Sequence, residues 1–317
     1  MHIPDGFLDA RTAIATGAIS VVGLGIALHS VRRRVPARRI PLIGLASAFV
    51  FAAQMLNFPV AGGTSGHLIG AVLAMVLLGP GAAVLIISSV LILQCFMFAD
   101  GGVTALGANI FNMGLVAPVV GYAIYSSIRR IVDAGMRGQL LATAFASWCS
   151  TVAASISCAG QLALSGAVAW NVAFPAMAGI HMLIGIGEAL ITTLVVASVG
   201  RVRPELLHEQ SMVSPRTGYG ELTAYGLLVS LGLTVFVAPF ACGWPDGLEK
   251  IASVLGFEHR ASTKGLIPSP LADYAVPGMS SPVFSTIIAG CIGTVIAFGL
   301  AYLLARILTP ARRSTPA

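Results

Sequence analysis

Long apolar stretches alternate with short polar segments along almost the whole chain. Stretches long enough, or nearly long enough, to cross a hydrocarbon layer of ~30 Å lie at roughly 12–31, 41–57, 81–98, 105–127, 139–164, 178–199, 222–242 and 283–308. A shorter stretch at 67–79 ends at Gly79-Pro80, and we expect a partial helix there that is shielded by its neighbours. The pattern therefore predicts an all-α polytopic membrane protein with about nine transmembrane segments.

The composition agrees with this prediction. Of 317 residues, 56% are hydrophobic and 9% are charged, and a mean hydropathy of +0.90 leaves too little polar surface to cover a soluble globule. The five cysteines form no C-x-x-C pair, and we expect them to be small buried side chains. Asp5 and Asp9 precede the first basic residue, Arg11, so the start lacks the basic region of a cleaved signal peptide and is expected to stay on the mature protein.

The basic residues fall mainly on one set of loops. Counted along the predicted segments, 14 of the 18 lysines and arginines lie in alternate loops, and the other loops hold only Arg11, Lys250, Arg260 and Lys264. By the positive-inside rule, the N-terminus is expected outside and the C-terminus in the cytoplasm of a bacterial cell membrane. The basic clusters are short and lack interleaved aromatic residues, which argues against nucleic-acid binding.

One polar stretch divides the chain. Residues 201–221 contain Pro204, Pro215, Gly218 and Gly220, a composition typical of a linker, here expected in the cytoplasm. It separates a predicted seven-helix module, 1–200, from a predicted two-helix module, 222–317. The second module has the only sizeable outside loop, at about 243–281, which contains the sequence PDGLE.

The first two residues carry the most specific candidate chemistry. The Met1 α-amine, the His2 backbone amide nitrogen and the His2 imidazole can close adjacent five- and six-membered chelate rings around one metal. A deprotonated amide in a plane of nitrogens suits Ni(II) or Cu(II), whereas Zn(II) favours tetrahedral sites and Mg(II) favours oxygen. Met1 is expected to survive processing because His2 is large, and Pro4-Asp5-Gly6 is a turn signal that can fold the terminus back into the protein.

His67 is the candidate for a fourth nitrogen. Its glycine-rich loop is predicted on the same side as the N-terminus, and glycines permit the close backbone approach that a buried ion needs. Asn57, Thr64 and Ser65 are the expected partners that orient the imidazoles, and His181 is a further candidate for that role. Each histidine alone has a plain alternative, because a histidine at position 2 or at a helix start is more often incidental or a hydrogen-bonded interface residue.

These residues resemble a known family. The start MHIPDGFL, together with GGTSGHLIG at 62–70, is similar to the nickel and cobalt substrate component of energy-coupling-factor importers. The sequence PDGLE at 245–249, followed by one last apolar segment, resembles the small second component of these importers, fused here to the first. The two resemblances cover about 1–200 and 222–308, which is nearly the whole chain.

The resemblance implies a seven-helix metal-capturing module, in which the Met1 amine, the amide and imidazole nitrogens of His2 and the His67 imidazole bind the metal. It also implies two kinds of partner, a transmembrane coupling subunit and cytoplasmic ABC ATPases, in agreement with the lack of a G-x-x-x-x-G-K-[ST] motif in this chain. The chain is then expected to be a transport subunit and not an enzyme, with no catalytic cofactor. Ni(II) is the expected substrate, and Co(II) for cobalamin synthesis is the alternative.

Two other classes of function compete with this interpretation. An intramembrane metalloenzyme is disfavoured because no H-E-x-x-H motif occurs and a filled nitrogen plane leaves no open position for water. An ion-coupled carrier normally has inverted repeats and several intramembrane charges, whereas Glu188 is the only acid well inside an apolar stretch. Glu188 is either part of a proton relay with His181 or hydrogen-bonded between helices near the cytoplasmic half. Asn112 and Gln161 are expected to join helices by hydrogen bonds.

A strip of small residues marks the second apolar stretch. Gly44, Ala48 and Ala52 recur every four residues and therefore share one helical face. In lipid such a strip allows another helix to approach closely. The strip either packs inside the chain or, as in other substrate components of this transporter class, contacts the coupling subunit.

Overall fold

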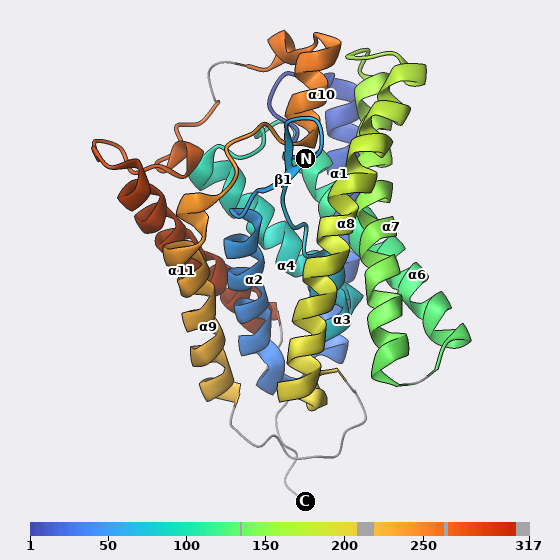
Figure 1. The fold of residues 1–317 in the computed structure, drawn as a ribbon, viewed down its shortest axis with the longest axis vertical. Helices are drawn as coiled ribbons and strands as arrows, with labels where there is room; N and C mark the ends of the chain where they lie inside the picture. Colours follow the sequence, from blue (N-terminus) through green and yellow to red (C-terminus); the bar gives the residue numbers. More distant parts are fainter. Residues whose placement is uncertain (134, 208–218, 263–265, 309–317) are drawn as a thin grey trace, which may run out of the picture.

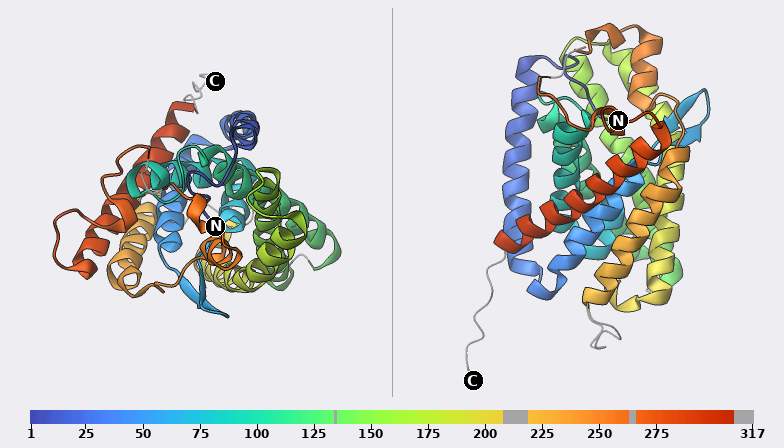
Figure 2. Two further views of the ribbon diagram at one scale, coloured as in Figure 1. Left: turned by 90° about the horizontal axis from the view of Figure 1, so that it is seen from above. Right: turned by 90° about the vertical axis from the view of Figure 1, so that its left-hand side faces the viewer.

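The computed structural model describes all residues except 134, 208–218, 263–265 and 309–317. The described part is a bundle of long helices, and the N-terminus lies in the interior near one end of it (Figures 1 and 2). Viewed from above in Figure 2, the N-terminus is near the middle of the bundle. The start of the chain is therefore placed where several helices converge.

Every stretch that the apolar pattern singled out forms a helix. In order, the α-helices and β-strands are α1 (Ala10–Arg34), α2 (Ile40–Gln54), β1 (Phe58–Val60), β2 (Thr64–Gly66), α3 (Ala71–Leu78), α4 (Pro80–Leu93), α5 (Leu106–Asn109), α6 (Ala117–Ile131), α7 (Met136–Leu164), α8 (Trp170–Val202), α9 (Tyr219–Phe236), α10 (Gly247–Leu255) and α11 (Pro282–Leu308). Gly79, with φ of 86°, and the following Pro80 separate α3 from α4, as the sequence predicts.

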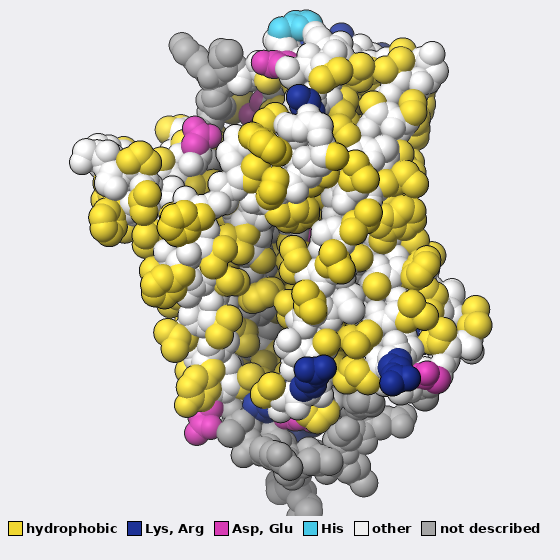
Figure 3. All heavy atoms as spheres, viewed as in Figure 1, with side chains coloured by type: hydrophobic (Ala, Val, Ile, Leu, Met, Phe, Trp, Pro, Cys, Tyr) yellow, Lys and Arg dark blue, Asp and Glu magenta, His cyan; other side chains and the backbone are white. Residues whose placement is uncertain are grey.

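The chain is a multi-pass membrane protein. Seven helices in the described residues are long and apolar enough to span a bilayer. α2 with 15 residues and α3 with 8 residues are shorter than the ~20 residues that a span requires. The helical membrane class is thus confirmed, with seven candidate spans among the nine stretches. Figure 3 shows hydrophobic side chains over most of one face of the bundle.

A small hairpin departs from the all-helical prediction. β1 pairs antiparallel with β2, with Val60 opposite Thr64. Gly62 and Gly63 form the connection with φ of 78° and 69°, values that glycine adopts without steric cost. The hairpin leads directly to His67, so the glycine-rich loop is an ordered element that fixes the position of this histidine.

The strip of small residues on α2 faces another helix of the same chain. A side chain at Gly44 would collide with the backbone of Phe298 in α11, and Ala48 and Ala52 have no exposed surface. Farther along the same face, Phe51 lies against Gly293 of α11. At Gly44, α11 occupies the space that a second subunit would need, which favours packing inside the chain for this part of the strip. Contact of the strip with the coupling subunit stays a prediction.

The C-terminal helices belong to the same bundle as the rest. α9 and α11 both contact α2, although they follow the polar stretch. Most of the expected linker at 201–221 lies outside the described residues, and the division into modules 1–200 and 222–317 stays a prediction. The contacts of α2 mean that the chain packs its last helices against its first ones.

Candidate metal centre

The first residues are held in the protein by backbone contacts. Ile3 is fully buried, and its amide donates to Asn109 Oδ1 at 2.8 Å. The Ile3 carbonyl accepts hydrogen bonds from Asn109 Nδ2 at 3.1 Å and from the Gly102 amide at 2.9 Å. One turn later, Asp5 accepts the amide and the hydroxyl of Thr104. These contacts fix the terminus on both sides of the turn that Pro4-Asp5-Gly6 predicts.

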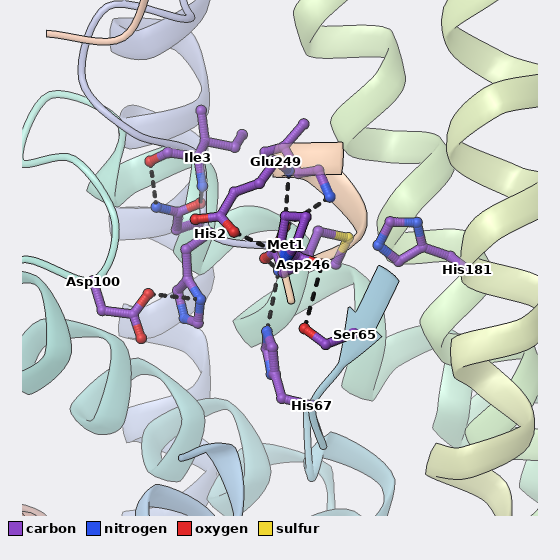
Figure 4. A network of polar contacts seen from close by, with 12 residues as sticks. Met1, His2, Ile3, Ser65, His67, Asp100, His181, Asp246 and Glu249 are labelled. Carbon is purple, nitrogen blue, oxygen red and sulfur yellow. Dashed lines mark hydrogen bonds and ion pairs between the residues drawn. The ribbon is translucent and has the colours of Figure 1, made fainter. Parts of the chain in front are cut away.

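The three predicted ligand residues meet in this buried site. The Met1 amine lies 3.1 Å from Nε2 of His67, and the rings of His2 and His67 stack with centroids 5.2 Å apart (Figure 4). Within the described residues, the His2 amide donates to no protein acceptor. Two nitrogens that bind one metal at right angles with bonds of ~2 Å lie about 3 Å apart. The distance between the Met1 amine and His67 therefore fits adjacent positions around one ion.

Two acids hold the other groups of the site. Met1 forms an ion pair through its ammonium with Oδ2 of Asp246, and Nδ1 of His2 lies 3.0 Å from Oδ1 of Asp100. Asp100 Oδ2 in turn accepts the hydroxyl of Tyr274 at 2.6 Å. Nδ1 is the atom that a six-membered chelate ring requires, so the His2 side chain must turn away from Asp100 to close that ring.

Burial sets the charges of these groups. Burial lowers the pKa of His2 in spite of the neighbouring Asp100. Burial, the positive N-terminus and His2 together lower the pKa of His67 to about 3. Burial opposes ionisation of Asp246, but the Met1 ammonium outweighs it and keeps the pKa of Asp246 well below its usual range. Both imidazoles are therefore neutral near pH 7, the form in which histidine binds metals.

Asp246 is fixed by the helix that it starts. Its Oδ1 caps α10 by accepting the amides of Leu248 at 2.8 Å and Glu249 at 2.9 Å, and Glu249 Oε2 accepts the Asp246 amide at 2.9 Å. This reciprocal pattern is a capping box. It leaves Oδ2 free to face Met1. The PDGLE sequence thus combines the start of a helix with a contact to the N-terminus.

The residues expected to orient the imidazoles have other partners. Ser65 donates its amide to the Pro245 carbonyl at 2.8 Å and its hydroxyl to the Trp244 carbonyl at 2.7 Å, so it joins the hairpin to the PDGLE sequence. Thr64 pairs with Val60 in the hairpin, and the Asn57 carbonyl accepts the Cys242 amide at 2.8 Å. These three residues shape the wall of the site without bonding to an imidazole in the described structure.

His181 lies beside the site without contacting a predicted ligand by a hydrogen bond. It lines a cavity of about 10 Å³ together with Met1, His67 and Asp246. Its Nδ1 lies 2.8 Å from the Met177 carbonyl, within its own helix. The imidazoles have other partners in this structure: Nδ1 of His2 faces Asp100, and Nδ1 of His67 lies 3.2 Å from the Leu68 carbonyl.

Glu188 supports the segment that follows His67. Its two carboxylate oxygens accept the amides of Ile69 at 2.6 Å and Gly70 at 2.9 Å, at the start of α3. The interpretation as a hydrogen-bonded group is confirmed, but its partners are the backbone beside the site and not a helix near the cytoplasmic half. The expectation that Asn112 and Gln161 join helices by hydrogen bonds is also confirmed, since the two side chains bond to each other at 3.0 and 2.7 Å.

Sequence reasoning missed Asp100 and Asp246. The signal for Asp246 was the PDGLE sequence itself, predicted on the same side as the N-terminus, whereas nothing local distinguishes Asp100. The described residues contain no group of three or more His, Cys, Asp or Glu side chains arranged around a metal position. Such a group is not needed here, because two of the candidate ligands are the terminal amine and a backbone amide.

Comparison with known families matches both parts of the chain. Residues 2–206 match the family described as the cobalt uptake substrate-specific transmembrane region, and residues 220–310 match the PDGLE domain. The putative fused nickel transport protein NikMN of Archaeoglobus fulgidus is 36% identical over 308 residues, which cover 96% of this chain and 98% of that protein.

Other relatives agree. The fused nickel transport protein NikMN of Rhodobacter capsulatus is 34% identical and is covered over 82% of its length by 85% of this chain. The putative cobalt transport protein CbiM of Methanococcus voltae is 33% identical, with 66% of this chain covering 95% of it. A crystal structure titled as a transition metal transporter superposes with a TM-score of 0.59 at 36% identity, over 67% of this chain and 98% of that one.

Proposed function

The chain belongs to the family described as the cobalt uptake substrate-specific transmembrane region, with a fused PDGLE domain, and from that premise we propose that it captures Ni(II) for import across a bacterial cell membrane. In this role it binds the metal and passes it on, and it catalyses no reaction. Ni(II) is thus its substrate.

One observation carries the proposal. The Met1 amine lies 3.1 Å from Nε2 of His67, and the His2 amide next to it donates to no protein acceptor in the described residues. With Nδ1 of His2 turned inward, these atoms form a plane of four nitrogens. Such a plane with a deprotonated amide suits the square-planar preference of Ni(II).

Co(II) is the second candidate substrate. The family description and the name of the Methanococcus voltae relative refer to cobalt, whereas the relatives from Archaeoglobus fulgidus and Rhodobacter capsulatus are named as nickel transport proteins. The planar chelate favours Ni(II), because Co(II) has a weaker preference for this geometry.

The importer also requires an energy source on other subunits. We propose a transmembrane coupling subunit and cytoplasmic ABC ATPases of the energy-coupling-factor type. The last turns of α1, α6, α8 and α11 carry arginines. By the positive-inside rule, this distribution supports a cytoplasmic position for these helix ends and an outside position for the metal site.

The test is metal analysis of the purified full-length chain with its native start. One Ni(II) per chain, with the absorption spectrum of a square-planar ion and preference over Co(II) in direct competition, is the expected result. Vesicles that also contain the coupling subunit and ATPases should take up Ni(II) only with ATP. A chain that binds neither metal, or that transports without ATPases, contradicts the proposal.

A further inference from the structure

The C-terminal part of the chain reaches into the metal site. Asp246, from the PDGLE sequence, lies 245 positions from Met1 and forms an ion pair with its ammonium. The Met1 side chain is almost fully buried and the Asp246 side chain is 13% exposed, so little water competes for this contact. The metal site is thus closed by a residue outside the part of the chain that supplies its ligands.

The two oxygens of Asp246 have separate tasks. Oδ1 caps α10 through the amides of Leu248 and Glu249, and Oδ2 faces Met1. An N-cap needs only one oxygen, and serine or asparagine serves as well as aspartate. Capping α10 therefore does not explain why Oδ2 is directed at the amine.

An acceptor at this place remains useful after the metal binds. An amine that coordinates a metal through its lone pair still has two N–H bonds, and one of them can keep donating to Oδ2. Partners of this kind fix the orientation of a ligand and increase its affinity for the metal. We propose that Asp246 is a positioning residue for the Met1 amine, so that the PDGLE segment completes the Ni(II) site; this inference rests on the proposed function.

Other contacts of the C-terminal part point the same way. Tyr274 donates its hydroxyl to Asp100, whose other oxygen lies 3.0 Å from Nδ1 of His2. The carbonyls of Trp244 and Pro245 accept both donors of Ser65, two residues before His67. In this structure Met1 is therefore linked to the C-terminal part directly, His2 through Asp100, and His67 through the hairpin that precedes it.

The test compares two variants of Asp246 with a matched control in the full-length chain. Asp246→Asn and Asp246→Ser keep the cap of α10 and remove the charged oxygen beside Met1. Glu249→Gln removes one negative charge from the same sequence and keeps an oxygen for the Asp246 amide, without touching Met1. Chelator competition should give about 10–100-fold weaker Ni(II) binding for both Asp246 variants, and a change below about threefold for Glu249→Gln.

The spectrum separates positioning from loss of a ligand. Ni(II) bound to the Asp246 variants should keep the square-planar absorption bands, because all four nitrogens are present. Wild-type affinity in either Asp246 variant, or equal losses in Glu249→Gln, overturns the inference and leaves the proposed function intact. A wild-type chain without Ni(II) contradicts the proposed function itself.

A second measurement does not depend on the variants being folded. In the metal-free wild-type protein, the Met1 amine should react with an acylating reagent far more slowly than the amine of a free peptide with the same first residues. Reaction at the peptide rate contradicts the contact with Asp246.

Discussion

The two halves of the bundle are built differently. Around the N-terminus, Met1, His67 and Asp246 line a cavity of about 10 Å³, and polar contacts connect segments far apart in the sequence. In the opposite half, α2, α3, α8 and α9 surround a groove of about 420 Å³ lined almost entirely by apolar side chains. One half is closed by directed bonds, and the other is left open between packed helices.

The two halves should therefore tolerate different amino-acid substitutions. A hydrogen bond or ion pair works only in a narrow range of distance and angle, so few substitutions preserve the site. Apolar contacts have no preferred direction, and an open groove can accommodate additional atoms. Substitutions should therefore have large effects on metal binding at the site, intermediate effects on stability beside it, and small effects in the groove.

The largest effect is expected for a residue added before Met1. The addition converts the buried amine into an amide, and it removes both the ion pair with Asp246 and one of the four nitrogens. The protein should still fold, because Ile3 keeps its hydrogen bonds to Asn109, but it should lose tight Ni(II) binding. Metal content after gel filtration measures this loss. An extension of the same length at the C-terminus is the control. Native Ni(II) affinity in the N-terminally extended protein would contradict the proposal that the Met1 amine is a metal ligand.

The next largest effect is expected for His67→Ala, which removes a neutral imidazole from the nitrogen plane. His181→Ala is the matched control, because His181 lines the same small cavity without being a proposed ligand. Ni(II) should be lost from the first variant and retained by the second. In the unsubstituted protein the bound Ni(II) should be diamagnetic, as a square-planar d8 ion is. A paramagnetic, octahedral ion would contradict the proposed plane.

An intermediate effect is expected for Glu188→Ala. This change leaves the amides of Ile69 and Gly70 buried without their acceptor, at a cost of about 1–3 kcal/mol for each donor. The free energy of unfolding in detergent should fall by about 3 kcal/mol, and Ni(II) affinity should fall because the segment after His67 loosens. Glu188→Gln, which retains one acceptor oxygen, should lose less. If the alanine variant is as stable as the parent protein, Glu188 does not stabilise the segment after His67.

The smallest effects, on stability alone, are expected for leucine substitutions at two positions on α2. Ala48→Leu adds three carbon atoms at a position of α2 with no exposed surface, and overpacking of this kind typically lowers stability by about 1–3 kcal/mol. Ala46→Leu extends into the open groove and should change stability by less than about 0.5 kcal/mol. Thermal unfolding of the two variants measures the difference. A stable Ala48→Leu protein that fails to co-purify with the coupling subunit would instead show that the strip is a docking face.

The sequence predicts much of the fold and of the ligand set. Each apolar stretch is a helix, and the break at Gly79-Pro80 lies where the chain predicts it. The same reasoning missed the hairpin that ends before His67, because its strands have only three residues each and carry no readable alternation. It also did not foresee the contact between Asp100 and His2, because proximity along the chain is a poor guide to contacts across a bundle.

The features that could be predicted from the sequence have a local or additive physical basis. Hydrophobicity summed over about 20 residues decides whether a helix can lie in lipid, and the chelate of Met1 and His2 uses adjacent atoms of the chain. Only the packing of the helices places Asp246 against Met1, Asp100 beside His2 and α11 over Gly44. These contacts join groups separated by many residues, and no local pattern encodes them. They depend on which helices pack together, because only that packing brings a buried amine and a carboxylate within reach of each other.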